Sequence, residues 1–150
     1  MLEGHVHHIG MTVSDLDAAL AFWERFLGVE ARWRAVLERP YIARHVGYPG
    51  ARIRAAFVDL PGSGILELLE YRDVERTPTD EGSANPGHAH LCLAVDEVQA
   101  VFERALGCGA RPVNPDGPVD VDAGPNKGAR ASYLRVPPDW HTLELFQAPR

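Results

Sequence analysis

The sequence has few cysteines, no cluster of positive charge and no long apolar run. Its two cysteines, Cys92 and Cys108, form neither a disulfide framework nor a CxxC metal motif, so we expect a reducing, cytoplasmic environment. The formal net charge is −6, and lysine and arginine form no stripe that would attract nucleic acid. No apolar run approaches the roughly 20 residues of a membrane-spanning helix, and the first residues predict no secretory signal. We therefore expect neither a nucleic-acid nor a membrane partner.

The composition is otherwise that of a globular domain rich in turns. Hydrophobic residues make up 45% and charged residues 24% of the chain, which is ordinary for a folded protein. The 14 glycines and 12 prolines predict many turns around a real core. A length of 150 residues fits one domain, or one domain built from two half-sized modules.

An internal repeat favours the two modules. Residues 8–16 (HIGMTVSDL) align with residues 90–98 (HLCLAVDEV), and each segment predicts a strand that runs into a helix. The expected helix N-caps are Ser14 and Asp96, and the expected terminators are Gly28 and Gly107. Each half also ends in a matching strand, with sequences LELLE (66–70) and LELFQ (143–147).

Each half has room for two more strands between its helix and its last strand. The candidates are 31–37 and 53–60 in the first half, and 111–113 and 130–136 in the second. Each half therefore predicts the order β-α-β-β-β, an α+β fold. We expect one domain over 1–150, with module 1 at about 4–71, a polar linker at 72–87 and module 2 at about 88–148. A long loop is expected at 114–127, a length typical of lids and binding loops.

Four polar side chains recur on one face of the predicted strands. Because strand side chains alternate between faces, His8, Glu67, His90 and Glu144 lie opposite the apolar face that packs under the helices. A carboxylate flanked by leucines is poorly solvated, so it is paired, protonated or bound to a cation. A single strand histidine is more often structural, and a single glutamate usually faces solvent. Recurrence in both halves favours the other interpretation, a divalent metal site with two imidazoles and two carboxylates.

At these residues the sequence resembles the vicinal oxygen chelate superfamily. The segments that carry the resemblance are 8–16 (HIGMTVSDL), 65–69 (ILELL), 87–96 (GHAHLCLAVD) and 142–146 (TLELF). Together they extend over nearly the whole chain. The resemblance implies paired βαβββ modules whose sheets curl into a half-barrel around a metal cleft, and it places the metal ligands at His8, Glu67, His90 and Glu144. One departure is Trp140, which stands where the family usually has glycine, so we expect a reshaped turn with an aromatic wall.

The number of ligands favours the glyoxalase and epimerase branches of that superfamily. Its dioxygenases and fosfomycin-resistance enzymes do not use the position of Glu67, and its bleomycin-binding members usually lack the set. The resemblance implies a metal-dependent isomerase, an epimerase that moves a proton beside a carbonyl through a metal-bound enediolate. Glu67 and Glu144 would be its catalytic carboxylates, and either can be the first base. The alternatives are methylmalonyl-CoA epimerase, lactoylglutathione lyase, and a non-catalytic small-molecule binding or resistance protein.

The cofactor implied is one divalent ion, Zn²⁺, Ni²⁺, Co²⁺ or Mn²⁺, all of which accept two nitrogens and two oxygens. The partner implied is a small-molecule substrate. We expect a homodimer, because family members commonly pair, and modules can be exchanged between chains.

A narrower resemblance suggests the substrate. Residues 41–54, with 66–71 and 124–128, resemble bacterial members that include the 2-epi-5-epi-valiolone epimerases, which implies a cyclic polyhydroxy ketone. The residues that would bind its hydroxyl groups are Tyr41, Arg44, His45, Tyr48 and Asn126. The alternative is that 40–48 is a short amphipathic helix with polar surface groups, and that Asn126 lies in a solvated turn.

Three further residues adjoin the predicted ligands. His7 is expected at the surface, on the strand face opposite His8. His88 shares the face of His90 and can hydrogen-bond behind it. Cys92 is expected to be a small packing residue and not a nucleophile.

Overall fold

The computed structural model describes residues 3–150, which form two compact units that divide between Pro78 and Thr79. The division lies inside the segment 72–87, where the sequence predicts a linker. The prediction that the first residues contain no secretory signal concerns Met1 and Leu2 among others, and these two lie outside the described residues. None of the helices among residues 3–150 is long and apolar enough to cross a membrane.

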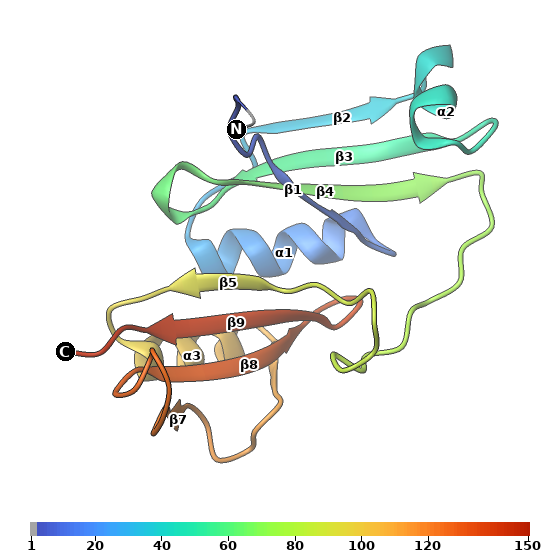
Figure 1. Cartoon of the computed structure of the whole chain (residues 1–150). Helices are drawn as coiled ribbons and strands as arrows, with labels where there is room; N and C mark the ends of the chain where they lie inside the picture. The colour runs from blue at the N-terminus through green and yellow to red at the C-terminus, as the bar shows by residue number, and fades with distance from the viewer. Residues whose placement is uncertain (1–2) are drawn as a thin grey trace. The chain divides into compact units, whose positions relative to one another are not determined.

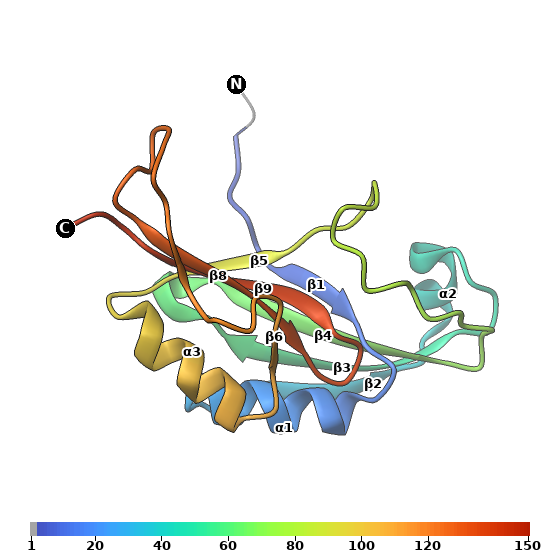
Figure 2. The same cartoon turned by 90° about the horizontal axis from the view of Figure 1, so that it is seen from below.

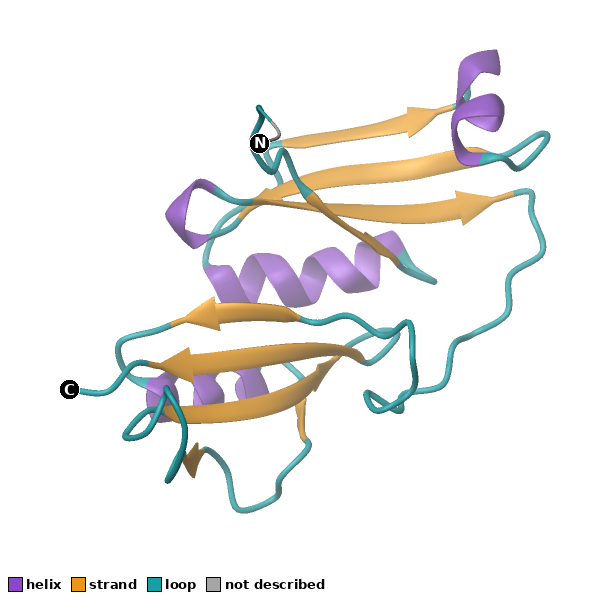
Figure 3. Cartoon of the chain, in the orientation of Figure 1, coloured by secondary structure: helices purple, strands orange, loops and turns teal. Residues whose placement is uncertain are grey.

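Unit 1 contains a four-stranded sheet and one long helix (Figures 1 and 3). Its elements are β1 (Ile9–Thr12), α1 (Leu16–Leu27), β2 (Trp33–Leu37), α2 (Pro40–Val46), β3 (Arg52–Asp59), the short 3₁₀ turn η1 (Pro61–Ser63) and β4 (Ile65–Arg72). The strand order is β1-β4-β3-β2, with β1 parallel to β4 and the other pairs antiparallel. The short helix α2 occupies the segment 40–48, where the sequence allowed one.

Unit 2 repeats this plan. Its elements are β5 (Leu91–Ala94), α3 (Val98–Gly107), β6 (Arg111–Pro112), β7 (Val119–Asp120), β8 (Arg130–Val136) and β9 (His141–Gln147). The strand order is β5-β9-β8-β6, with β7 also paired to β8 and β5 parallel to β9. The short strand β7 lies inside the segment 114–127, where the sequence predicts only a loop. The α+β class with two βαβββ modules is confirmed. Each module forms its own open sheet, so neither sheet by itself curls into the half-barrel that the resemblance implies.

The two helices begin one residue later than the sequence predicts. Asp15, and not Ser14, is the N-cap of α1, because its Oδ1 accepts a hydrogen bond from the backbone N–H of Ala18 at 3.0 Å. A carboxylate at this position also interacts favourably with the positive end of the helix dipole. Glu97, and not Asp96, is the N-cap of α3, with no side-chain capping bond.

The last strand of each unit supplies an additional cap to the helix. Glu70 Oε2 accepts a hydrogen bond from the N–H of Leu16 at 3.3 Å, and Gln147 Oε1 accepts one from the N–H of Val98 at 2.9 Å. The two acceptors occupy equivalent positions in β4 and β9. Each bond fixes a helix N-terminus against one face of its sheet. On the opposite face of the same strands, the alternation of side chains places Glu67 in β4 and Glu144 in β9.

Each long helix packs on one face of its sheet and leaves the other face for polar residues. Helix α1 contacts β3 and β4, and α3 contacts β8 and β9. In unit 1, α2 packs on the opposite face, where Ile42 forms a buried cluster with Ile53 and Ala55. Figure 2 shows α1 and α2 on opposite sides of this sheet. Helix α2 therefore closes one end of the face that carries Glu67.

Candidate functional site

In unit 1 the structure brings His8 and Glu67 together. His8 lies directly before β1, and Glu67 lies on β4 opposite Gly10. His8 Nε2 is 3.0 Å from Glu67 Oε2, and the two side chains are 37% and 15% exposed. The His8 ring stacks on Phe57 at a centroid distance of 6.1 Å, and Phe57 is the partner of Glu67 in the β3–β4 register. The pair is thus partly screened from water by an aromatic ring.

In unit 2 the same arrangement joins His90 and Glu144. His90 lies directly before β5, and Glu144 lies on β9 opposite Cys92. His90 Nε2 is 2.9 Å from Glu144 Oε2, and the side chains are 39% and 21% exposed. The His90 ring lies 5.1 Å from the ring of Tyr133, which is the register partner of Glu144. Each unit therefore presents one imidazole nitrogen and one carboxylate to the same local space.

Each pair supplies two of the donors that a metal ion would take. Among residues 3–150, neither unit by itself gathers three or more histidine, cysteine, aspartate or glutamate side chains as a metal site. Each pair nevertheless offers one nitrogen and one oxygen donor that face one another. These are the donor types that divalent Zn, Ni, Co and Mn accept, so the residues fit half of such a site in each unit.

The two pairs differ in their immediate neighbours. Beside Glu67 the strand carries Gly10, where an added Cβ would lie 3.8 Å from Glu67 Oε2. Beside Glu144 the equivalent position is Cys92. Burial, the negative charge of Glu144 and a hydrogen bond to it raise the pKa of the Cys92 thiol to about 11. The thiol is therefore protonated at neutral pH and donates to Glu144, in agreement with the expectation that Cys92 is not a nucleophile.

A second neighbour also differs between the pairs. Tyr133 stands beside Glu144 where Phe57 stands beside Glu67. The pKa of the Tyr133 phenol is raised, mainly by burial and to a lesser extent by the negative charge of Glu144. Glu144 thus lies beside two protic groups, a thiol and a phenol, whereas the equivalent positions beside Glu67 carry none.

The expectation that His7 lies away from His8 is wrong. His7 Nδ1 is 2.8 Å from His8 Nδ1, and the two rings meet edge to face. The alternation rule fails here because β1 begins only at Ile9, so residues 7 and 8 are not in regular strand geometry. The contact engages Nδ1 of His8 and leaves Nε2 directed to Glu67.

Two other residues near the predicted ligands have different surroundings. His88 is exposed and lines a small cavity of about 30 Å³ with Arg135 and Trp140. Trp140 has a φ of 59°, the left-handed conformation that a glycine would adopt readily. The Arg111 guanidinium lies 3.4 Å above its ring, a cation–π contact that favours the tryptophan. The turn thus places Trp140 in a backbone conformation that glycine adopts readily, and the guanidinium of Arg111 covers its half-buried ring.

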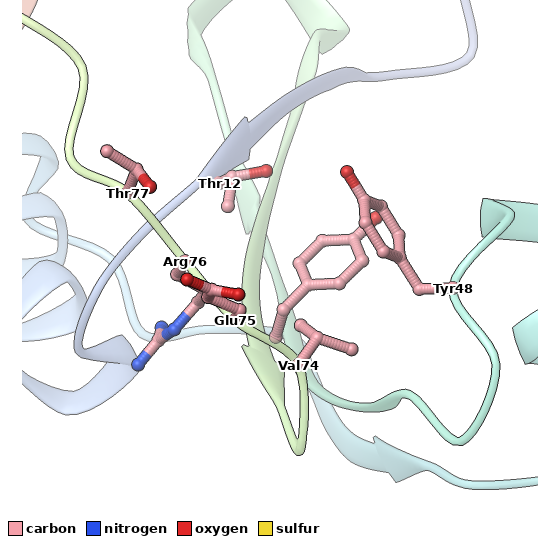
Figure 4. A pocket seen from close by; sticks show the side chains of 7 residues that line it. Thr12, Tyr48, Val74, Glu75, Arg76 and Thr77 are labelled. Carbon is pink, nitrogen blue, oxygen red and sulfur yellow. The ribbon is translucent and has the colours of Figure 1, made fainter.

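The residues predicted to contact substrate divide into two groups. Tyr41, Arg44 and His45 are exposed on α2, and Asn126 is exposed in the loop before β8. Tyr48, which follows α2, lines a cavity of about 340 Å³. Figure 4 shows this cavity, and its lining residues are Thr12, Tyr48, Tyr71, Val74, Glu75, Arg76 and Thr77.

The cavity continues the face that carries Glu67. Tyr71 follows Glu67 on β4 at an even spacing, so the two side chains lie on the same side of the sheet. Thr12 likewise shares the face of Gly10 on β1. Sequence reasoning did not identify Thr12 or Tyr71, although the alternation from Glu67 to Tyr71 contained the signal. It also assigned residues 74–77 to the linker.

Comparisons with known proteins agree with this architecture. Residues 7–131 match the family described as the glyoxalase/bleomycin resistance protein/dioxygenase superfamily. A glyoxalase family protein from Bacillus cereus has a similar crystal structure, with a TM-score of 0.78 at 20% identity, covering 100% of this chain and 99% of that chain. The chain belongs to this superfamily, which is the vicinal oxygen chelate superfamily. Members of the superfamily include enzymes, and they typically use a divalent metal.

Two relatives carry enzyme names. The chain is 30% identical over 148 residues to a 2-epi-5-epi-valiolone epimerase from Actinomyces sp, covering 96% of this chain and 79% of the relative. It is 27% identical over 149 residues to a probable lactoylglutathione lyase from Vibrio parahaemolyticus, covering 98% of this chain and 93% of the relative.

Proposed function

We propose that the two histidine–glutamate pairs bind one divalent ion. We propose further that the protein is an isomerase, which removes a proton from the carbon beside a carbonyl group and returns a proton to it. One observation carries the proposal. Equivalent positions of two units each direct an imidazole Nε2 and a carboxylate oxygen toward one another, at 3.0 Å and 2.9 Å. The ligands would be His8, Glu67, His90 and Glu144. The ion, when bound, supplies Lewis acidity that makes a hydrogen beside a carbonyl labile.

The two carboxylates then act as general base and general acid. An epimerisation needs one group to remove the proton from one face of the carbon and another to deliver a proton to the opposite face. Glu67 and Glu144 come from different modules, which supports this division of roles. The thiol of Cys92 donates a hydrogen bond to Glu144, and the phenol of Tyr133 lies beside it, so Glu144 lies among groups that carry protons, which suits the carboxylate that returns one. We therefore assign proton removal to Glu67 and proton return to Glu144.

The substrate that we favour is a cyclic polyhydroxy ketone of the 2-epi-5-epi-valiolone type. Its support is the similarity to an epimerase of that name over most of the chain. A lactoylglutathione lyase is the second candidate, supported by the relative from Vibrio parahaemolyticus. Both reactions move a proton beside a carbonyl, so the same carboxylates would serve either of them.

Deuterium incorporation tests the reaction and the roles. In D₂O the protein should introduce deuterium at the epimerised carbon of 2-epi-5-epi-valiolone, and a chelator should abolish this turnover. Glu67→Gln should lose both deuterium exchange and inversion, because the first base is gone. Glu144→Gln should lose inversion but keep exchange into the starting epimer.

The matched control is Glu38→Gln, which alters an exposed glutamate directly after β2 and should leave turnover unchanged. NMR of the recovered ketone measures both exchange and inversion. Full activity after removal of all metal would refute the proposal. A purified protein that binds metal and ligand without exchange would instead be a binding protein.

A further inference from the structure

The cavity beside the Glu67 face is lined mainly by uncharged hydroxyl groups. Thr12, Tyr48, Tyr71 and Thr77 each contribute one, and Val74 is the purely aliphatic member of the lining. Figure 4 shows the hydroxyls of Thr12 and Tyr48 directed toward one another. The volume of about 340 Å³ is near the lower end of the range for small-molecule sites, roughly 300–1,000 Å³. The size and the polarity fit a small ring that carries several hydroxyl groups.

The charged residues of the lining do not select an anion, because Arg76 and Glu75 have opposite signs. The Arg76 guanidinium donates to the backbone carbonyl of Ser14 at 3.3 Å, and Figure 4 shows it turned away from Tyr48. Glu75 contributes a carboxylate to the same wall. A phosphate or a carboxylate placed here would meet a negative charge, whereas ligand hydroxyls can donate to that carboxylate.

The two tyrosines are held in position before any ligand arrives. Their rings meet edge to face, with centroids 5.9 Å apart. Tyr71 packs against the buried cluster of Ile42, Ile53 and Ala55, which ties the wall of the cavity to α2 and β3. Such preorganisation lowers the entropic cost of ordering side chains on binding.

The cavity is electrostatically connected to the candidate catalytic carboxylate. The pKa of Tyr71 is raised, mainly by burial and to a lesser extent by electrostatic repulsion from Tyr48 and from the negative charge of Glu67. Tyr71 also shares the strand and the face of Glu67. A ring bound between the tyrosines would therefore extend toward the carboxylate that we assign as the base.

We propose that this cavity binds the hydroxyl-bearing part of a neutral, polyhydroxylated cyclic substrate, and that Thr12, Tyr48 and Tyr71 determine specificity for it. The inference rests on the proposed function for the chemistry at the carbonyl, but the cavity lies wholly in residues 12–77. It favours a polyhydroxy ketone over substrates that carry several negative charges, such as a glutathione or coenzyme A conjugate.

Kinetics with single hydroxyl deletions tests the specificity. A hydrogen bond to an uncharged group contributes about 0.5–1.5 kcal/mol, so Tyr48→Phe and Tyr71→Phe should each raise the KM for 2-epi-5-epi-valiolone about 2- to 12-fold. The value of kcat should change little. Thr12→Val should behave similarly. The control is Ser63→Ala, which removes one hydroxyl from the exposed turn η1 and should not change KM; thermal unfolding of each variant checks that it folds.

A binding measurement separates this inference from the proposed reaction. The chain has four tyrosines, so ¹³C-labelled tyrosine ring signals can be assigned from the Tyr→Phe variants. Adding 2-epi-5-epi-valiolone to chelator-treated protein should shift the signals of Tyr48 and Tyr71, and S-lactoylglutathione should not. Shifts without turnover after metal is restored would refute the reaction and keep the cavity assignment. Turnover with unchanged signals and unchanged KM values, or shifts by S-lactoylglutathione, would overturn the cavity assignment.

Discussion

At the scale of single residues, the two halves of the candidate site have the same types of ligand, a histidine and a glutamate, but different neighbouring side chains. Strand alternation was sufficient to place Glu67 and Glu144 on the strand faces opposite the helices, and each carboxylate meets the histidine that precedes β1 or β5. It could not reveal that Phe57 and Tyr133 lie beside the two glutamates, because that depends on the register between separate strands. The chemical difference between the two carboxylates is therefore a consequence of sheet pairing.

The state of the Cys92 thiol can be measured by alkylation. Its pKa of about 11, against roughly 8.5 for a free cysteine, reduces the thiolate fraction at neutral pH by more than 100-fold. In chelator-treated protein, iodoacetamide should therefore modify Cys92 more than 100-fold more slowly than free cysteine, although the residue is exposed.

The rate of that alkylation should rise with pH toward about pH 11, because only the thiolate reacts. Mass spectrometry of the peptide that contains Cys92 measures the rate at each pH. Rapid modification at pH 7 would contradict the protonated thiol. Cys92→Ala confirms that the modified peptide is assigned correctly.

At the scale of elements, the last strand of each module serves two faces at once. In β4, Glu67 points to the candidate site, whereas Glu70 is buried under α1 with 2% exposure. Glu70 accepts hydrogen bonds from Arg54 Nη1 at 2.9 Å and from the N–H of Leu16, and it pairs with Arg72 Nη2 at 2.6 Å. The anchor of the helix and the functional carboxylate thus lie on one rigid strand.

Substituting Glu70 should show how much this anchor contributes to stability. Glu70→Ala leaves the partly buried Arg54 and a helix N–H without this acceptor, so the free energy of unfolding should fall by about 2–4 kcal/mol. Glu70→Gln should lose about half as much, because an amide oxygen can still accept from Leu16, as Gln147 does for Val98.

Urea unfolding followed by circular dichroism measures these losses. The matched variant in the other module is Gln147→Ala, which removes only the cap and should cost about 1 kcal/mol. Equal stability of Glu70→Ala and the unaltered protein would contradict the anchoring role.

At the scale of the whole molecule, each unit holds half of the proposed donor set. The prediction of one ion per chain follows from combining the two pairs, whereas independent pairs would bind two ions weakly. The homodimer and the cytoplasmic location stay predictions as well.

Metal content gives a direct measure of the combined site. Purified protein loaded with Zn²⁺ and then desalted should retain about one ion per chain. His8→Ala and His90→Ala, made separately, should each reduce the amount of retained ion by at least 10-fold, because loss of one ligand weakens the binding of an ion that both pairs share. Mass spectrometry of the metal, with the protein concentration from absorbance, provides the ratio.

The matched control for the metal measurement is His5→Ala, because His5 is an exposed residue near the N-terminus. It should retain the ion. Two ions per chain, or full retention in either His8→Ala or His90→Ala, would show that the pairs do not share a cation.

Sequence alone determined the modular plan and the positions of the two pairs. The period of two along each strand and the recurrence of the pattern in each half are local properties, so β1, β4, β5 and β9 and their polar faces were predictable. The helix ends were predicted only to within one residue, because the side chain that reaches a free N–H decides the cap. Asp15 reaches Ala18, and strand residues distant in sequence complete the caps.

Tertiary structure decided which side chains surround each glutamate and where a small ligand can lie. The stacking of His8 on Phe57 and the cavity between Tyr48 and Tyr71 both join segments that no local pattern relates. Packing of α2 on the sheet brings residue 48 to residue 71, since burial of Ile42 against Ile53 and Ala55 fixes the helix there. Such long-range packing depends on the shape of several elements together, and a one-dimensional pattern does not contain it.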